Sequence, residues 1–360
     1  MEDLLLMNRV KSTVLALLAS IIAVSGFLLP FEASAQGSAA LSIVPKKNYT
    51  VEAGKSVNDT LLIRNQDQQQ PLNLTLRVVD FTYLDESGAP KLNLDQNAPQ
   101  TTWSLKPFLK IPEKVTVDPG ESKTIDLEVS VPANQGAGSY YSAIVYSSGS
   151  ADGGNVGLSA SGVTLAFVNI PGEVKENLIL EKLGAYRSSG SSSTGGSYAF
   201  SMATMPQRIA YTLKNEGNVA ESPVGSITLK PLIGKEITID NINPQGSLAL
   251  IGQTRTFVSC IKLAGQEVDF EGSRTEATAC ADPGLWPGYY KVEMAAYYGQ
   301  NGNNTRDLVG TGGFWYLPGW FVIIVAAIVL FVAYRIWRIV RYIRQKQSGG
   351  AAKRAPRRRK

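Results

Sequence analysis

The chain has 360 residues, of which 44% are hydrophobic, and a formal net charge of +5 at pH 7. It contains no histidine, which excludes the Ser-His-Asp triad and every metal site that depends on imidazole, so we expect no metal and no cofactor. The charge is segregated: residues 335–360 carry 11 of the 35 Lys and Arg, whereas 36–334 has 22 basic and 27 acidic residues. A nucleic-acid-binding body would need a basic face, so we expect no nucleic-acid partner.

The N-terminal segment has the composition of a secretory signal peptide. Two basic residues precede the apolar run 13–29, and small residues end the segment before Gln36. This order predicts a signal peptide over 1–35 that is cleaved between Ala35 and Gln36. The apolar run is slightly long, which leaves open an uncleaved signal anchor. Both alternatives place 36–313 across the membrane from the C-terminal tail.

The body of the chain shows short strand patterns separated by turns. Apolar residues alternate with mostly polar ones over 72–79 and again over 125–131, which is typical of half-buried β-strands. Turn sequences rich in Gly, Pro and Asn separate such runs, for example at 118–120. We therefore predict a mainly β protein with two immunoglobulin-like antiparallel β-sandwich domains, over 40–174 and 175–312.

A weak internal repeat indicates that the two domains are related units. Its first copy reads GESKT at 120–124 and GSYY at 138–141, and its second reads GQTRT at 252–256 and GYY at 288–290. In each copy a glycine-led turn precedes one strand, and a second glycine precedes a tyrosine-rich strand. The two motifs are 18 residues further apart in the second copy, which indicates an insertion.

The two cysteines of the chain, Cys260 and Cys280, lie within this insertion. An even pair of cysteines in an exported domain is by default a disulfide, so we predict that they bond and close the insertion into a loop. The alternative is a bridge between the two sheets, as in antibody domains. The short separation of the cysteines argues against that alternative.

Without histidine, a pair of carboxylates is the remaining route to hydrolysis. The densest acidic group near aromatic residues is Asp80 with Asp85 and Glu86, which gives a carboxylate-based glycosidase as a further hypothesis. Acidic residues at a strand end and turn are usually solvated, and their spacing in sequence does not define the separation that the mechanism needs. We therefore assign no catalytic residue and predict that the chain is not an enzyme.

The segment 314–337 is predicted to be a transmembrane helix. Its apolar run, 314–334, contains no charged residue. As a helix this run would be about 31 Å long, which matches a hydrocarbon layer about 30 Å thick. The aromatic residues Phe314, Trp315 and Tyr316 at its start suit the headgroup region.

The segment 338–360 that follows is basic and contains no acidic residue. By the positive-inside rule this asymmetry predicts a cytoplasmic tail, and hence a single-pass cell-membrane protein with an extracytoplasmic body. The basic anchor beside the membrane consists of Arg335, Arg338, Arg341 and Arg344. The tail could also touch RNA, but attraction to acidic headgroups explains its charge more simply.

Two runs in the first domain carry a family resemblance. They read VEAGKSVNDTLLIRNQDQQQPLNLTLRVVDF at 51–81 and TTWSLKPFLKIPEKVTVDPGESKTIDLEVSVPANQGAGSYYSAIVY at 101–146. Together they resemble the N-terminal domain of WxL-interacting proteins of Gram-positive cell surfaces, and the order of signal peptide, two sandwiches, span and basic tail is similar too. The resemblance implies a first domain that binds peptidoglycan and a second that engages host or partner ligands beside secreted WxL proteins. We carry over no binding residue from the family.

These observations favour a membrane-anchored extracytoplasmic binding or adhesion protein of a bacterial envelope, which holds cell-wall polymer (peptidoglycan) or a secreted surface protein. The alternative from another class is an accessory subunit of a membrane complex, in which the sandwiches act as spacer or assembly domains. The sequence identifies neither the ligand nor the oligomeric state.

Overall fold

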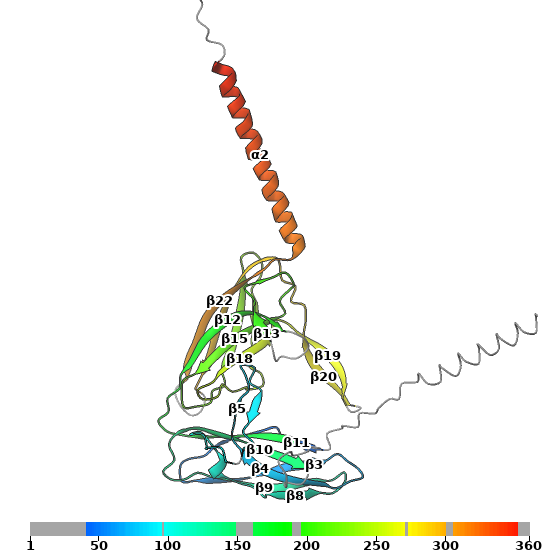
Figure 1. Cartoon of the computed structure of the whole chain (residues 1–360), viewed down its shortest axis with the longest axis vertical. Helices are drawn as coiled ribbons and strands as arrows, with labels where there is room; N and C mark the ends of the chain where they lie inside the picture. The colour runs from blue at the N-terminus through cyan, green and yellow to red at the C-terminus, as the bar shows by residue number, and fades with distance from the viewer. Residues whose placement is uncertain are drawn as a thin grey trace, which may run out of the picture. The chain divides into compact units, whose positions relative to one another are not determined.

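The computed structural model describes residues 41–95, 97–148, 161–188, 196–270, 273–299 and 305–351. The predicted signal peptide over 1–35, with its cleavage between Ala35 and Gln36, lies outside these residues, and so does the end of the basic tail. The described chain forms two β-sandwiches followed by a long α-helix (Figure 1). The predicted fold class, mainly β with two β-sandwich domains, is confirmed by the sheets.

Sandwich 1 consists of a four-stranded and a five-stranded sheet. The four-stranded sheet contains, in order, β1 (Leu41–Ile43), β3 (Ser56–Asn65), β9 (Ser122–Ser130) and β7 (Leu109–Lys110). The five-stranded sheet contains β2 (Lys46–Thr50), β11 (Ser161–Ile170), β10 (Gly138–Ser148), β4 (Leu72–Val79) and β8 (Lys114–Val117). All neighbours are antiparallel except β2 and β11, which are parallel.

The alternation in the sequence decides which face of each strand enters the core of sandwich 1. In β4, Leu72, Leu74 and Leu76 are buried, whereas Asn73 between them is exposed. The strand β9 shows the same period, as predicted from its alternating residues. The turn predicted at 118–120 precedes β9, and Gly120 there has φ +69°, a conformation that favours glycine.

Sandwich 2 has the same two-sheet architecture. Its four-stranded sheet contains β13 (Gly196–Tyr198), β12 (Leu178–Ser188), β15 (Arg208–Asn215) and β18 (Thr254–Cys260). Its five-stranded sheet contains β14 (Ser201–Met202), β22 (Arg306–Tyr316), β21 (Gly288–Tyr298), β16 (Val224–Pro231) and β17 (Ile237–Ile239). The pair at one edge, β14 and β22, is again parallel.

The strand order confirms the internal repeat that the sequence predicted. When the strands are matched in chain order, β2, β4, β8, β10 and β11 of sandwich 1 correspond to β14, β16, β17, β21 and β22 of sandwich 2, and the two five-stranded sheets have the same order. The two GxxxT motifs lie at the starts of β9 and β18, and the glycines at 138 and 288 begin β10 and β21. The two five-stranded sheets are therefore copies of one topology. In the four-stranded sheets β1, β3 and β9 match β12, β15 and β18, whereas the fourth strands, β7 and β13, lie at opposite edges.

A buried asparagine occupies the same position in both copies, at the end of β3 and of β15. The Asn65 Nδ2 donates to three backbone carbonyls at 2.9 to 3.2 Å, and the Asn215 Nδ2 donates to two at 2.7 and 2.8 Å. Each Oδ1 accepts the backbone N–H two residues further on, at 3.0 Å from Asp67 and 2.9 Å from Gly217. This side chain therefore holds together the loops at one end of each sandwich.

The copies differ in what is inserted. Sandwich 1 carries residues 80–113 between β4 and β8, and this 80–113 insertion contains β5 (Phe81–Tyr83), β6 (Pro90–Leu92), the 3-10 helix η1 (Lys106–Phe108) and β7. Sandwich 2 carries β19 (Leu263–Phe270) and β20 (Ser273–Cys280) between β18 and β21. Cys260 and Cys280 form a disulfide, so the predicted pairing is confirmed. The segment between them is an antiparallel hairpin rather than the expected loop.

The helix α2 (Gly319–Ala351) follows sandwich 2 and begins five residues later than the sequence predicted. The residues Phe314, Trp315 and Tyr316, which were assigned to its start, continue β22 and pair with β21. Phe314 and Tyr316 are only 0% and 7% exposed, because they pack in the core of sandwich 2. An uncharged aromatic run suits a buried strand as well as a membrane helix, so the sequence alone could not separate the two.

The part of α2 from Gly319 to Gln345 is long and apolar enough to cross a membrane. Its most apolar stretch has a mean hydropathy of 2.4, and its side chains are exposed in the structure. The four arginines of the predicted basic anchor, Arg335, Arg338, Arg341 and Arg344, all lie on the second half of this helix.

Candidate functional site

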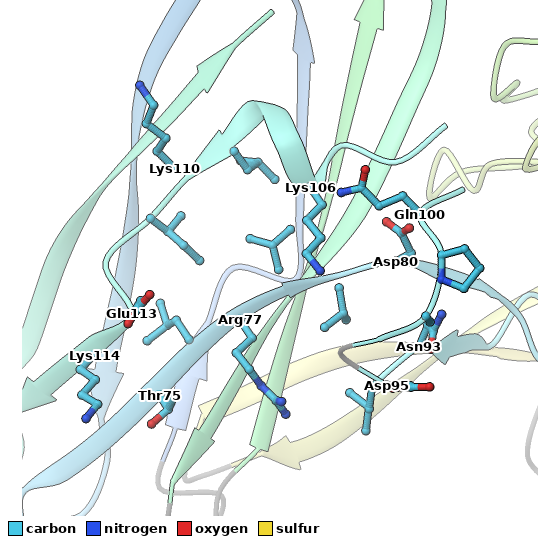
Figure 2. Close-up of a pocket in the computed structure, with 18 residues that line it drawn as sticks. Thr75, Arg77, Asp80, Asn93, Asp95, Gln100, Lys106, Lys110, Glu113 and Lys114 are labelled. Carbon is cyan, nitrogen blue, oxygen red and sulfur yellow. The ribbon is translucent and has the colours of Figure 1, made fainter. Parts of the chain in front are cut away.

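A groove of about 740 Å³ opens at one edge of sandwich 1, along the second half of β4 (Figure 2). Strand β4 with the start of β8 forms one wall, and the 80–113 insertion forms the other. We call it the edge groove and define it by its lining residues, 75–80, 93–95, 98–100, Lys106, 109–111, Glu113 and Lys114. The groove arises because the insertion leaves β4 after Val79 and returns to β8 from the side.

The groove exposes an unpaired stretch of the β4 backbone. On one side β4 pairs with β10 from residue 74 to residue 79. On its other side β8 pairs only with 72–75, and the ladder ends where the Leu76 N–H donates to the Glu113 carbonyl at 2.8 Å. Because alternate residues of a strand direct their N–H and C=O to the same side, the backbone groups of Val78 point into the groove. No protein group within the described residues is paired with them there.

Unpaired basic side chains surround this open edge. Arg77 comes from β4, Lys106 from η1 and Lys114 from the start of β8 (Figure 2). None of these three forms an ion pair with a residue that the structure describes, whereas Lys110 is paired with Glu128 at 3.2 Å. The lining has four basic and three acidic residues, so the groove is slightly basic in a body that is acidic as a whole.

Asp80, one of the acidic lining residues, holds one end of the groove together. Its carboxylate is buried and accepts hydrogen bonds from the Ser104 hydroxyl at 2.6 Å and the Ser142 hydroxyl at 3.1 Å. It also accepts the Thr101 N–H at 3.1 Å. The Asp80 carbonyl accepts the Asn93 N–H at 2.8 Å, which ties the 93–104 stretch to the end of β4.

The acidic group that the sequence singled out does not form one cluster. Asp85 lies in an exposed turn, where its Oδ1 accepts the Ser87 N–H at 2.8 Å. The Glu86 carboxylate accepts the Thr256 hydroxyl at 3.2 Å, across to sandwich 2. Asp80, Asp85 and Glu86 therefore have different partners and three separate structural roles.

The 80–113 insertion also joins the two sandwiches. The Tyr83 N–H donates to the Gln253 Oε1 at 2.7 Å, and the Tyr83 hydroxyl donates to the Leu248 carbonyl. The Arg255 guanidinium donates to the Tyr83 hydroxyl at 2.9 Å and to the Leu248 carbonyl at 2.7 Å. Its carbon lies 5.0 Å from the centre of the Tyr83 ring, close enough for a cation–π contact. A shared apolar cluster that includes Phe81 of sandwich 1 lies beside these bonds.

Sequence reasoning identified neither the groove nor this junction. Val78, Lys106 and Lys114 belong to three separate elements, and nothing in their spacing indicates that they meet. The available signal was the stretch between the strand patterns at 72–79 and 125–131, which is longer than a simple hairpin needs.

No protein-family model matches the sequence, and no curated protein matches it. Among solved structures, the class 5 fimbriae chaperone CfaA is similar over 75% of this chain and 98% of its own, at 12% identity and a TM-score of 0.34. The E. coli chaperone DraB is similar over 77% of this chain and 98% of its own, at 14% identity and a TM-score of 0.29. Likeness at these identities concerns the fold alone.

Proposed function

We propose that this chain is a membrane-anchored extracytoplasmic binding protein of a bacterial envelope, and that the edge groove of sandwich 1 holds its ligand. The ligand is a cell-wall polymer or an extended segment of a surface protein. In this proposal α2 is a single membrane span, its arginines lie on the cytoplasmic side, and both sandwiches lie outside the cell. The protein performs no chemistry on what it binds.

The proposal rests on one observation: the unpaired backbone edge of β4 at Val78 lies beside three basic side chains that form no ion pair with a described residue. A free strand edge offers backbone N–H and C=O groups to an extended peptide, which can add to the sheet as a further strand. The cations Arg77, Lys106 and Lys114 suit the carboxylates of such a peptide or of a wall polymer. Both kinds of ligand are extended and can carry carboxylates, which suits a slightly basic groove along a free strand edge.

The family resemblance supports the same site. The matched runs at 51–81 and 101–146 contain β3, β4 and β7 to β10, so the groove lies largely between residues that resemble the N-terminal domain of WxL-interacting proteins. That domain is the one for which the resemblance implies peptidoglycan binding. Membership of this family is part of the proposal.

The test is a pull-down with the full chain in detergent micelles, on purified peptidoglycan and on envelope extract. The groove variant combines Arg77→Ser, Lys106→Ser and Lys114→Ser, and the control combines Lys55→Ser, Arg64→Ser and Lys123→Ser, three exposed basic residues outside the groove. We expect the groove variant to lose binding about tenfold or more and the control to lose less than about twofold. Equal losses, or no retained wall material or envelope protein with the unmodified chain, would contradict the proposal.

A result of a different kind would favour the accessory-subunit alternative. In that case the full chain would retain no wall material, but crosslinking in the membrane would capture another membrane protein through α2. The groove variant would then have no effect on the crosslinked product, because the helix would carry the contact.

A further inference from the structure

The end of sandwich 2 next to α2 exposes large apolar side chains. Outside α2, five such side chains in the described part of the chain are more than two-thirds exposed. Four of them are Phe200 at 69%, Leu232 at 73%, Ile233 at 87% and Trp286 at 72%. The fifth, Val309, lies elsewhere on β22. We call the first four the helix-proximal patch.

The strand registers place all four members of the patch at one level. Gly288 pairs with Tyr316 at the last residue of β22, and Trp286 comes two residues before Gly288. The Leu232 N–H donates to the Tyr289 carbonyl at 3.2 Å, and the Trp315 N–H donates to the Phe200 carbonyl at 2.7 Å. The patch therefore lies within one or two residues of the point where β22 ends.

The segment between the end of β22 and the start of α2 is short, and backbone hydrogen bonds hold it in place. The Leu317 N–H donates to the Met202 carbonyl at 2.8 Å, and the Phe321 N–H donates to the Pro318 carbonyl at 2.9 Å. Since β22 ends at Tyr316 and the helix begins at Gly319, only Leu317 and Pro318 separate the sandwich from the first turn of the helix. A bilayer that surrounds the apolar part of α2 therefore begins next to the patch, because the span starts there.

The equivalent end of sandwich 1 is covered. There the start of β10 meets sandwich 2, where the Ser139 N–H donates to the Asn218 carbonyl at 3.1 Å and the Ala220 N–H donates to the Ser139 hydroxyl at 2.9 Å. Apolar side chains near this end, including Tyr141, pack against Leu250 of sandwich 2. Within the part of the chain that the structure describes, nothing covers the corresponding end of sandwich 2.

We propose that the helix-proximal patch docks on the lipid bilayer into which α2 inserts, so that Leu232, Ile233 and Phe200 enter the interface and Trp286 lies at the headgroups. This inference rests on the membrane anchoring in the proposed function, but not on the groove. Trp is the residue type most suited to the interface, and aliphatic side chains gain from burial just below it. Lys235 in the same turn as Ile233 can pair with an anionic headgroup.

The consequence is that the membrane limits how the extracytoplasmic body tilts. A sandwich joined to a span by two residues and held at a second point by a loop cannot rotate freely about the helix axis. The patch would thus help to keep the edge groove in a constant orientation relative to the membrane and the cell wall.

The test uses the full chain in vesicles of phosphatidylcholine and phosphatidylglycerol, with one photoreactive diazirine side chain for each variant. The diazirine replaces Ile233 in the patch, Val309 as an exposed control, or Val329 within the span. Val309 lies seven residues before the end of β22, or about 23 Å away along the strand. Because Ile233 is 87% exposed, its replacement leaves the core intact, and the intact Cys260–Cys280 disulfide reports correct folding.

We expect lipid adducts at Ile233 and at Val329, with a yield at Ile233 at least about fivefold above that at Val309. A yield at Ile233 no higher than at Val309, with strong labelling at Val329, would overturn the docking while the anchor stands. An adduct from Ile233 to a second copy of the chain instead of lipid would overturn it as well. No labelling at Val329 would refute the anchoring itself, and the docking with it.

Discussion

The segment that follows β4 in sandwich 1 differs from the segment that follows the matching strand β16 in sandwich 2. In sandwich 1, β4 continues into the 80–113 insertion, whose Phe81 and Tyr83 pack against the second sandwich. In sandwich 2, the matching strand β16 continues into the five-residue turn 232–236, which leaves Ile233 exposed at the end of the sandwich from which α2 continues. The shared topology is kept where the strands pair, and the copies diverge where each end meets a different neighbour.

A second difference concerns the core at one matched position. Leu72 of sandwich 1 pairs with Val117, and the corresponding bridge in sandwich 2 joins Glu221 to Ala249. Both Leu72 and Glu221 are buried, so sandwich 2 holds a carboxyl group where sandwich 1 holds an aliphatic side chain.

The largest losses of stability are expected at the buried asparagine that both copies share. Asn65→Ala and Asn215→Ala should each destabilise their sandwich by about 3 kcal/mol, because each removes a fully buried amide that donates to two or three backbone carbonyls and accepts one N–H. Thermal unfolding of the full chain in micelles measures the effect, with Asn58→Ala on the exposed face of β3 as control. A loss of stability from only one of the two substitutions would show that the asparagines are not equivalent.

The next effect is a pH dependence of the folding stability, which arises from Glu221. Burial raises the pKa of Glu221 to about 7, although the Gly299 N–H donates to its carboxylate at 3.1 Å. Since its pKa in the unfolded chain is near 4.5, the folded form binds more protons between these values, and stability falls as pH rises through about 7. The difference corresponds to at most about 3 kcal/mol.

The variant Glu221→Gln should therefore flatten the decline in melting temperature between pH 5 and pH 8. The control is Glu52→Gln, which removes an exposed carboxylate from sandwich 1 and should leave the decline unchanged. An unaltered pH profile in Glu221→Gln would mean that this carboxyl group is not the source of the decline.

A smaller effect is expected at the junction between the copies. Arg255→Ala removes the hydrogen bond and the cation–π contact that the guanidinium makes with Tyr83 across the junction, and should weaken the junction by about 2 kcal/mol. Calorimetry of the full chain should then show two separate transitions in place of one shared transition. Arg64→Ala serves as the control, and a single transition in both variants would show that the remaining contacts couple the sandwiches without Arg255.

The smallest effect concerns an ion pair within sandwich 1. The Lys47 ammonium, at 2.7 Å, and then the Tyr49 hydroxyl hold the pKa of Asp59 at about 2. Its contribution to stability is present above about pH 4 and is lost as pH falls toward 2. Because these side chains are partly exposed, Asp59→Asn should cost no more than about 1 kcal/mol at pH 7.

Asp126→Asn is the matched control for this change, since Asp126 is exposed on the neighbouring strand β9. Acid unfolding monitored by circular dichroism compares the two variants. A similar change in both would indicate a general charge effect rather than the Asp59 pair.

Local patterns were enough to predict much of the fold. The alternation in β4 and β9, the repeated motifs and the pairing of Cys260 with Cys280 all depend on residues close in sequence or on composition. The start of α2 was misplaced because Phe314 is as suitable for a buried strand as for a membrane helix. The groove could not be predicted, since Val78 and Lys106 meet only through the path of the 80–113 insertion.

The measurement that tests the central proposal most directly is hydrogen exchange of the full chain in micelles, with and without fragments of digested peptidoglycan or enriched envelope protein. Ligand binding at the edge groove should slow exchange of the Val78 amide about tenfold or more, because its N–H gains a partner. Amides of β16, the matching strand of sandwich 2, should not change. Protection of β16 or another surface under conditions of proven binding, with the Val78 amide unchanged, would contradict the account.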